Sequence, residues 1–311
     1  MKLKNKESLR KLFKQIHKGR QLYLLLALPL IYLIIFAYIP MAGVQIAFKN
    51  YTFKGGIWGS EWVGFKHFIK FFSDYKFIPT LVNTLRVSVY NLTVSTFTPI
   101  FLALSLNCLN HKGLKKAIQT LTYLPHFISV VVLIGMMTQM MNPIIGIYGT
   151  IVHRITGERA VDLLAIPSAF THLYVWSGVW QNTGFSSIIY IAALAGSDQD
   201  LHEAAQIDGA TRLQRVRYID IPCIIPTAVI LLILNAGKIM TVGFEKVYLL
   251  QNSLNVEYSE VISTYVYKMA FGTGSNFSYS TAIGVFNSVV NLIMIMTVNM
   301  ISKKVSDSSL W

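Results

Sequence analysis

The chain is poor in charged residues and in cysteine. Only 13% of its 311 residues are charged and 53% are hydrophobic, whereas about 25% charged residues is usual in soluble domains. Low charge together with 13% aromatic residues excludes a disordered chain. Cys108 and Cys223 are too few for a disulfide-stapled secreted fold, and we expect both to be reduced, small packing residues. The composition therefore indicates an integral membrane protein and excludes a soluble enzyme with a polar surface.

The chain also lacks the common sequence signatures of catalysis. No Gly-x-x-x-x-Gly-Lys-Ser/Thr loop is present to hold nucleotide phosphates, and no Cys-x-x-Cys pair occurs. His202-Glu203 begins like the helix of a zinc protease, but Gln206 stands where the second histidine would be. We therefore expect no catalytic residue, no metal site and no cofactor bound by this chain itself.

Six long stretches with little or no charge are present. A helix needs roughly 20 apolar residues to cross about 30 Å of hydrocarbon, where lipid offers no partners for free backbone groups. Five of the stretches contain no charged residue, and the fifth in chain order contains only Lys238. The sequence predicts an all-α integral membrane protein with six transmembrane helices, at about 22–41, 87–109, 117–140, 168–195, 223–243 and 281–301.

The basic residues are distributed unevenly between the two sides of this arrangement. Sixteen of the 27 lie in the first 20 residues, in the loops after the second and fourth spans, and in the C-terminal tail. The loops on the opposite side are longer, yet they hold only nine. Since Lys and Arg near span ends favour the cytoplasmic side, we expect both termini in the cytoplasm. The net charge of +13 is thus an orientation signal, and we expect no nucleic-acid partner.

The loop between the fourth and fifth spans predicts two short helices joined at a sharp bend. Asp198 or Asp200 can cap the first helix, and Gly209 can end it because glycine adopts a positive φ without steric cost. Thr211 and Gln214 have the spacing of a capping box for the second helix. On these grounds the loop is either a simple connector or an element on which a soluble partner docks.

The same loop resembles a known family motif. Glu203-Ala204-Ala205, Gly209 and Ile221-Pro222 follow the spacing of the EAA motif of ABC importer permeases, except that the family pattern ends in Leu-Pro. By local rules Pro222 ends the second helix or opens the next span. The resemblance implies a coupling helix that docks on an ATPase subunit. It implies a coupling role for Glu203, Ala204, Ala205, Asp208, Gly209, Ala210, Arg212 and Pro222.

Shorter segments extend the resemblance over roughly residues 20–303. Residues 183–196 are similar to carbohydrate-type permeases of the type-I importer fold. Residues 123–127 and 243–247 are similar to the subgroup that imports oligosaccharides from polysaccharide breakdown. The implied complex has a second permease of different sequence, two cytoplasmic ATPase subunits that bind ATP and Mg²⁺, and an external sugar-binding protein. It lies in a bacterial inner membrane and works by alternating access.

The predicted spans and the family resemblance together divide the chain into four parts. Residues 1–20 form a basic cytoplasmic leader, and residues 21–83 contain the first span and an external segment. Residues 84–301 form the transmembrane core, which includes the 198–222 loop, and residues 302–311 form a cytoplasmic tail.

Lys238 is the single charged residue inside an expected span. A lysine at this depth usually faces a cavity or a partner, although a long side chain can also extend to the membrane surface. If the first interpretation holds, Lys238 and the nearby Asn235 line the substrate pathway, where the positive charge would suit an acidic sugar.

Aromatic and amide side chains in and after the fourth span form a second candidate pathway group. Aromatic rings stack on sugars, while amides bond to sugar hydroxyls. Trp and Tyr also gather at membrane surfaces as anchors, so both interpretations stay open. The residues concerned are Tyr174, Trp176, Trp180, Gln181 and Asn182.

The external segment 49–80 predicts a short amphipathic helix, because phenylalanines at 65, 68, 71 and 72 alternate with Lys66 and Lys70. It suits contact with membrane lipid, with the binding protein or with the second permease.

Two other classes of protein are less consistent with the sequence. An ion-coupled secondary transporter of a small polar solute would have several ionisable residues within spans and internal repeats. A membrane-embedded enzyme would need catalytic residues at one depth.

Overall fold

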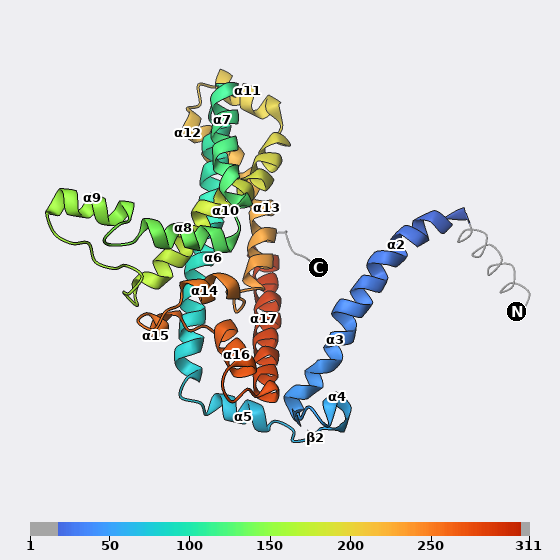
Figure 1. Ribbon diagram of the computed structural model, residues 1–311. Helices are drawn as coiled ribbons and strands as arrows, with labels where there is room; N and C mark the ends of the chain where they lie inside the picture. Colours follow the sequence, from blue (N-terminus) through green and yellow to red (C-terminus); the bar gives the residue numbers. More distant parts are fainter. Residues whose placement is uncertain (1–17, 306–311) are drawn as a thin grey trace, which may run out of the picture.

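The structure is a computed structural model that describes residues 18–305 and is mostly helical (Figure 1). The described residues contain one small antiparallel pair of strands, β1 (Lys49–Asn50) and β2 (Glu61–Trp62). Figure 1 shows α7, α11 and α12 at one end of the molecule and α5 and α16 at the other. These two ends are called the loop end and the hairpin end below.

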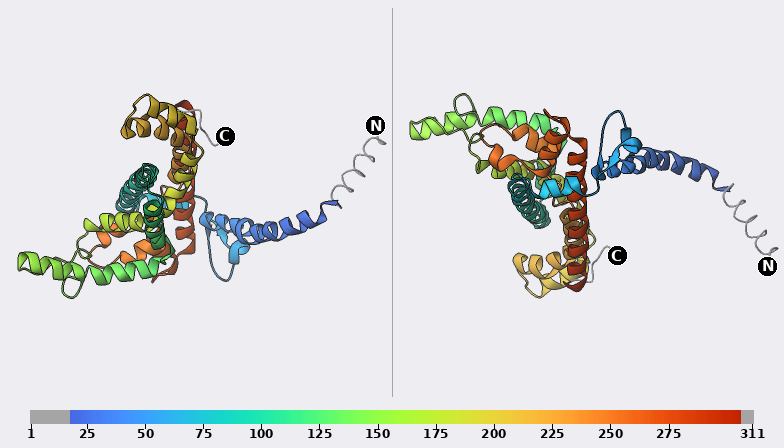
Figure 2. Two further views of the ribbon diagram at one scale, coloured as in Figure 1. Left: turned by 90° about the horizontal axis from the view of Figure 1, so that it is seen from above. Right: turned by 90° about the horizontal axis from the view of Figure 1, so that it is seen from below.

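The first helical segment leaves the body of the molecule. It consists of α2 (Arg20–Leu33), a π-helical turn (Ile34–Tyr38), α3 (Ile39–Met41) and a 3₁₀ helix (Ala42–Phe48). Pro40 has no N–H for the carbonyl four residues earlier, and the Ile39 N–H bonds five residues back, to Ile34. In this first helical segment, no residue of the most apolar stretch is buried. In Figures 1 and 2, α2 points away from the other helices. The segment is longer than the expected span 22–41.

The short helix predicted within residues 49–80 is confirmed as α5 (Lys66–Phe72), which follows the short α4 (Gly56–Gly59). Within α5, the Phe71 side chain is fully buried, whereas the side chains of Ile69 and Phe72 are exposed. The helix therefore has one face against the protein and one apolar face outside it.

Four long helices form the body: α6 (Phe77–Asn107), α10 (Ala169–Ala195), α13 (Ile221–Ala236) and α17 (Phe277–Val305). α10 packs along α6 and also contacts α13, which in turn packs on α17. A hydroxyl contact of 3.1 Å between Thr98 and Thr183 joins α6 to α10. Near the loop end, Ala103, Tyr190, Leu194 and Ile224 form a buried cluster between these helices.

The expectation of one straight helix over 117–140 is wrong. α7 (Lys112–Tyr123) and a 3₁₀ turn (Leu124–Phe127) are followed by α8 (Val130–Met140), and the two parts are bent by 101°. Ser129 adopts an extended conformation and its hydroxyl accepts from the Val132 N–H, so a new helix begins there. The chain then continues sideways into α9 (Ile147–Thr156), as Figure 1 shows.

Apolarity identifies fewer spans than the six expected. Among the described residues, four helical segments are long and apolar enough to cross a membrane, and the bent pair brings the number to five. The remaining expected span corresponds to α10, whose 27 residues are sufficient for about 40 Å at 1.5 Å per residue. The four segments are Arg20–Phe48, Phe77–Asn107, Arg212–Ala236 and Phe277–Lys304.

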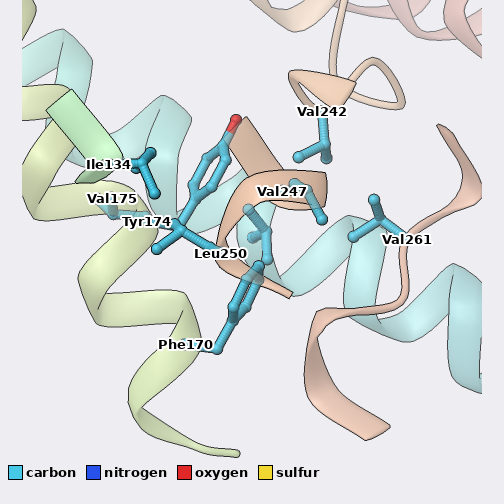
Figure 3. Packing of buried hydrophobic residues seen from close by; sticks show 9 residues of the cluster. Ile134, Phe170, Tyr174, Val175, Val242, Val247, Leu250 and Val261 are labelled. Atoms are coloured by element: carbon cyan, nitrogen blue, oxygen red, sulfur yellow. The ribbon is translucent and has the colours of Figure 1, made fainter. Parts of the chain in front are cut away.

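Short helices cover the body toward the hairpin end: α14 (Phe244–Leu250), α15 (Val256–Ser259) and α16 (Ile262–Phe271). Apolar side chains of α14, together with Val242 before it and Val261 before α16, meet α8 and α10 in one buried cluster, drawn in Figure 3. Its labelled members are Ile134, Phe170, Tyr174, Val175, Val242, Val247, Leu250 and Val261.

Asp74 ties the start of α6 to α16 and α17. One of its carboxylate oxygens accepts from the hydroxyls of Tyr265 (2.8 Å) and Tyr279 (2.7 Å). Burial alone would raise the pKa of the Asp74 carboxyl, but hydrogen bonds from the Lys76 N–H and the two tyrosines lower the pKa below its usual value. Glu260 adds ion pairs with Lys76 and Lys268, at 3.3 and 2.7 Å.

Gly184 allows α10 to approach α7 closely. A Cβ added at this position would overlap the backbone carbonyl group of Thr122. We predict that Gly184→Ala lowers the free energy of unfolding by about 1–3 kcal/mol, because the two helices must separate to admit the methyl group. The measurement is the thermal unfolding midpoint of the purified protein in detergent.

Gly135→Ala is the matched control, because an added Cβ at this exposed helical position meets nothing within 4 Å. An unfolding midpoint for Gly184→Ala at or above that of Gly135→Ala would contradict the close packing of α7 and α10.

Candidate functional site

The 198–222 loop contains two helices with the predicted caps. α11 (Gln199–Ile207) begins at Asp198, whose carboxylate accepts from the Asp200 N–H at 3.0 Å. Gly209 follows the C-cap of α11 and has φ +75°. The Gly209 N–H bonds to the Gln206 carbonyl at 3.1 Å, and the Ala210 N–H bonds to the Ala205 carbonyl at 2.9 Å. These are the bonds of a Schellman motif, which needs a residue with positive φ at this position. The bend is thus determined by local hydrogen bonds.

The second helix, α12 (Arg212–Arg215), carries the predicted capping box. The Thr211 hydroxyl accepts from the Gln214 N–H at 3.3 Å, and the Gln214 side chain accepts from the Thr211 N–H at 2.7 Å. α12 continues through a π-helical turn (Val216–Asp220) into α13. Pro222 therefore ends no helix; it lacks an N–H, and the preceding Ile221 N–H bonds to Val216, five residues back.

A buried carboxylate beneath the bend was missed by the sequence analysis. Asp220 is 2% exposed. Its Oδ1 accepts from the side chain of Asn107 at 3.2 Å and lies 3.2 Å from Nε2 of His202. Asp220 thus joins α11, the π-helical turn and the end of α6, three segments that the sequence separates by up to 113 positions.

The outer surface of the bend exposes large apolar side chains. Ile207 is 87% exposed and Leu213 is 77% exposed, one on each side of Gly209. Leu201 and Tyr218 are also more than half exposed. Apolar residues in an otherwise polar loop are the sequence signal that could have identified them. These apolar residues add to the eight coupling residues that the family motif implies. Of those eight, six are exposed, and Ala205 and Ala210 are half-buried.

The chain is not helical between α13 and α14. The expected span 223–243 ends at Ala236, and residues 237–243 form turns and irregular backbone. Gly237 lies so close to α17 that an added Cβ would be 2.9 Å from Ile295. Lys238 therefore lies just beyond the helix end, on a break, and not on a helix as expected.

Side chains from three other helices satisfy the polar groups of this break. Asn291 in α17 accepts from the Met240 N–H and donates to Thr241, each at 2.9 Å. The Tyr174 hydroxyl in α10 accepts from the Gly243 N–H at 3.1 Å, and the Ser263 hydroxyl donates to the Val242 carbonyl at 3.2 Å. In Figure 3 the Tyr174 ring extends from α10 toward the segment that carries Val242. Irregular backbone at membrane depth is tolerated when it is satisfied in this way or lines a cavity.

A cavity of about 570 Å³ lies beside the break, between α6, α10 and α13. Asn235 and Lys238 line it, and both side chains are exposed to it. Its other polar walls come from α6 and α10, and the volume falls in the range of about 300–1,000 Å³ typical of small-molecule sites. The polar lining residues are Ser88, Asn91, Ser95, Thr96, Tyr174, Ser186, Tyr190, Asn235, Lys238 and Thr241.

The aromatic and amide group of the fourth span is divided by the fold. Tyr174 lines both this cavity and a neighbouring one of about 450 Å³, and Gln181 and Asn182 line the second. Trp176 and Trp180 line neither cavity and are each 52% exposed; the Trp176 indole N–H donates to the Tyr90 hydroxyl at 2.9 Å. The fold thus brings Tyr174 into one cavity with Lys238, places the two amides in the neighbouring cavity, and leaves the tryptophans outside both.

The part of the chain that holds the loop and both cavities matches a known family over residues 79–307, described as "Binding-protein-dependent transport system inner membrane component". This chain belongs to that family. Its permease fold is confirmed by a solved structure, a bacterial alginate ABC transporter in complex with an alginate pentasaccharide-bound periplasmic protein. The superposition has a TM-score of 0.87 at 38% identity and covers 96% of this permease and 99% of that chain.

Two relatives from Bacillus subtilis (strain 168) are similar over nearly the whole chain. The polygalacturonan/rhamnogalacturonan transport system permease protein YteP is 40% identical over 306 residues, which is 98% of this permease and 95% of that protein. Protein LplB is 40% identical over 296 residues, 95% and 92% of the two chains.

Family membership determines the general function. The chain is a multi-pass membrane protein and the permease component of an ATP-driven importer, and it is not an enzyme. The alternative of an ion-coupled secondary transporter is not favoured, because the relatives belong to ABC systems.

Asn291 is the main polar support of the break beside Lys238. We predict that Asn291→Ala lowers the free energy of unfolding by about 1–3 kcal/mol, because the N–H of Met240, a residue that is 1% exposed, loses its partner. Thr241 is exposed, so the loss of its bond to Asn291 adds little. Thermal unfolding of the purified protein measures the change.

Ser288→Ala, one turn earlier on α17, provides the comparison, since its exposed hydroxyl bonds only within its own helix. If both variants unfold together with the wild type, Asn291 does not hold the break.

Proposed function

We propose that this permease imports acidic oligosaccharides from polysaccharide breakdown across a bacterial inner membrane, driven by ATPase subunits that dock on the 198–222 loop. The observation that carries the proposal is the geometry of that loop. It combines a bend held by a Schellman motif and a capping box with exposed Ile207 and Leu213 on its outer surface.

The bend suits docking because it is both firm and apolar. Exposed isoleucine and leucine side chains at the tip of a polar loop gain free energy when a partner covers them, and fully burying such a side chain contributes about 1.5–3 kcal/mol. A bend already ordered by its own hydrogen bonds loses little conformational entropy on binding. Two ATPase subunits, which bind ATP and Mg²⁺, would contact this loop and its counterpart on the second permease.

A continuous helix connects the loop to the cavity. The helical segment Arg212–Ala236 begins at the capping box and ends two residues before Lys238. A displacement of the bend would therefore reach the cavity wall without passing through a flexible joint. The contacts of Asp220 with Asn107 and His202 provide a second route, from α11 to α6. Alternating access to the cavity would follow from these movements.

The cargo follows from the cavity and from the relatives. Lys238 places a cation among hydroxyl and amide side chains, which suits a sugar that carries a carboxylate. The names of the relatives mention polygalacturonan, rhamnogalacturonan and alginate, and the first and last are polymers of sugar acids. An external sugar-binding protein would deliver the oligosaccharide.

The uncovered first segment supports a second permease as partner. The apolar surface of Arg20–Phe48 is free of contacts with the body of the molecule over its most apolar window. We infer that a second permease of different sequence covers part of it and that membrane lipid covers the rest. With the loop end facing the cytoplasm, both termini would lie inside, as the distribution of Lys and Arg predicts.

Two matched pairs of residues test the docking loop. Ile207 and Gly209 lie at the end of α11 with the same spacing as Ile155 and Gly157 at the end of α9; both glycines have φ +75°, and both isoleucines are more than three-quarters exposed. We predict that Gly209→Ala and Ile207→Ser each reduce sugar-dependent ATP hydrolysis and uptake several-fold. Alanine at this φ costs about 1–2 kcal/mol of strain, and serine removes apolar contact area.

Gly157→Ala and Ile155→Ser introduce the same chemical changes outside the loop and should leave uptake unchanged. The measurements are sugar uptake into proteoliposomes and the amount of ATPase that purifies with the permease. Equal uptake by all four variants would exclude the loop as the coupling site.

Substitution of Lys238 tests whether this residue lines the substrate pathway. We predict that Lys238→Met reduces uptake of an acidic oligosaccharide about ten-fold or more, because a charge-assisted hydrogen bond contributes about 1.5–3 kcal/mol. Uptake of radiolabelled trigalacturonate is the measurement, and Lys66→Met, an exposed lysine on α5, is the control. Unchanged uptake by Lys238→Met would remove Lys238 from the pathway.

A further inference from the structure

Lys246 is a buried cation that forms no ion pair within the described part of the chain. It is the third residue of α14 and is 8% exposed. Its Nζ donates to the backbone carbonyl of Tyr174 at 2.7 Å and lies 4.7 Å from the centre of the Tyr174 ring. Within residues 18–305, no ion pair within 4.0 Å includes Lys246. A carbonyl and a ring face compensate only part of the several kcal/mol that desolvating an ammonium costs.

The surroundings leave space beside this ammonium. Lys246 lines the cavity of about 450 Å³ together with Gln181, Asn182 and Phe244. Gly178 lies directly against the Nζ, and an added Cβ there would be 3.0 Å from it. An ammonium has three donors, and the hydrogen bond to the Tyr174 carbonyl uses one of them.

The chemistry of the cavity matches one unit of a sugar acid. The ammonium can bond to a carboxylate. Gln181 donates to the Ile128 carbonyl, and Asn182 bonds to His126 and to the Gly178 carbonyl, so the remaining donor and acceptor positions of the two amides can bond to ring hydroxyls. Phe244 offers an apolar face for the C–H side of the ring. Glu245 also lines the cavity and is exposed, so its carboxylate can accept from a hydroxyl at the open side.

The two cavities are neighbours. Asn91 and Tyr174 line both, with Lys238 in the larger cavity and Lys246 in the smaller. A chain of sugar acids that passes from one cavity to the other would therefore meet a cation in each.

We propose that the Lys246 cavity is a second carboxylate subsite, which takes one sugar-acid unit of the cargo while a neighbouring unit lies near Lys238. This inference rests on the proposed import of acidic oligosaccharides. Lys246 acts as a specificity-determining residue, because a neutral sugar leaves the buried ammonium without its anion.

The test compares two sugars in the complete transporter, reconstituted in proteoliposomes with its ATPase and binding protein. The probes are trigalacturonate and its fully methyl-esterified form, which keeps the ring hydroxyls but has no charge. Each variant is described by the ratio of the two uptake rates, since the unchanged binding protein contributes equally to every variant.

We expect Lys246→Gln to lower the ratio of acid to ester about ten-fold, whereas Lys246→Arg keeps most of it because it keeps the charge. Gly178→Ala should also lower the ratio, because its methyl group crowds the Nζ while the lysine remains. It therefore tests the subsite even if Lys246→Gln fails to assemble. Lys54→Gln, an exposed lysine that lines neither cavity, should leave the ratio unchanged.

Three results would overturn the subsite. One is an equal slowing of both sugars in Lys246→Gln, as expected for a lysine that only tethers α14 to α10. The second is a wild-type ratio near one. The third is recovery of the wild-type ratio in Lys246→Gln when a carboxylate of the second permease is neutralised, which would make that carboxylate the counter-charge. Failure of the proposed function looks different: the wild-type transporter would then accumulate neither sugar.

Discussion

The arrangement of this permease depends on how the irregular backbone at residues 237–243 is satisfied. Free N–H and C=O groups are costly where water is excluded, so a helix can stop inside a membrane only if other groups take over its hydrogen bonds. Asn291 from α17, Tyr174 from α10 and Ser263 from α16 do this here. The same bonds hold three helices around one point, and the break exposes Lys238 to the cavity instead of continuing the helix past it.

One helical segment connects the 198–222 loop to the break. The helix between them contains the π-helical turn before Pro222, and a similar π-helical turn precedes Pro40 in the first helical segment. In both cases a proline without an N–H disturbs the regular ladder while the helix continues. The carboxylate of the buried Asp220 is stabilised at this turn because the side chains of Asn107 and His202 contact it. The turn thus links α11 and α6 to this helix without ending it.

The loop was predictable in detail because its geometry is local. Asp198, Gly209 and the pair Thr211–Gln214 each act through bonds between residues no more than five positions apart, and these bonds form as expected. The family motif over the same residues added a function that the caps alone do not specify. The bend of 101° in the third span was not predictable in the same way, since the extended Ser129 interrupts an apolar run that is otherwise continuous.

By itself, the amino-acid sequence determined the membrane environment, the helical class, the fold of the loop and the family, because composition, capping and motif spacing are properties of neighbouring residues. Tertiary structure decided where the polar groups of the proposed pathway lie. Met240 meets Asn291 across 51 positions, and Lys246 meets Tyr174 across 72. No local pattern indicates that a lysine next to an exposed glutamate is buried, because its burial is produced by α10 packing over it.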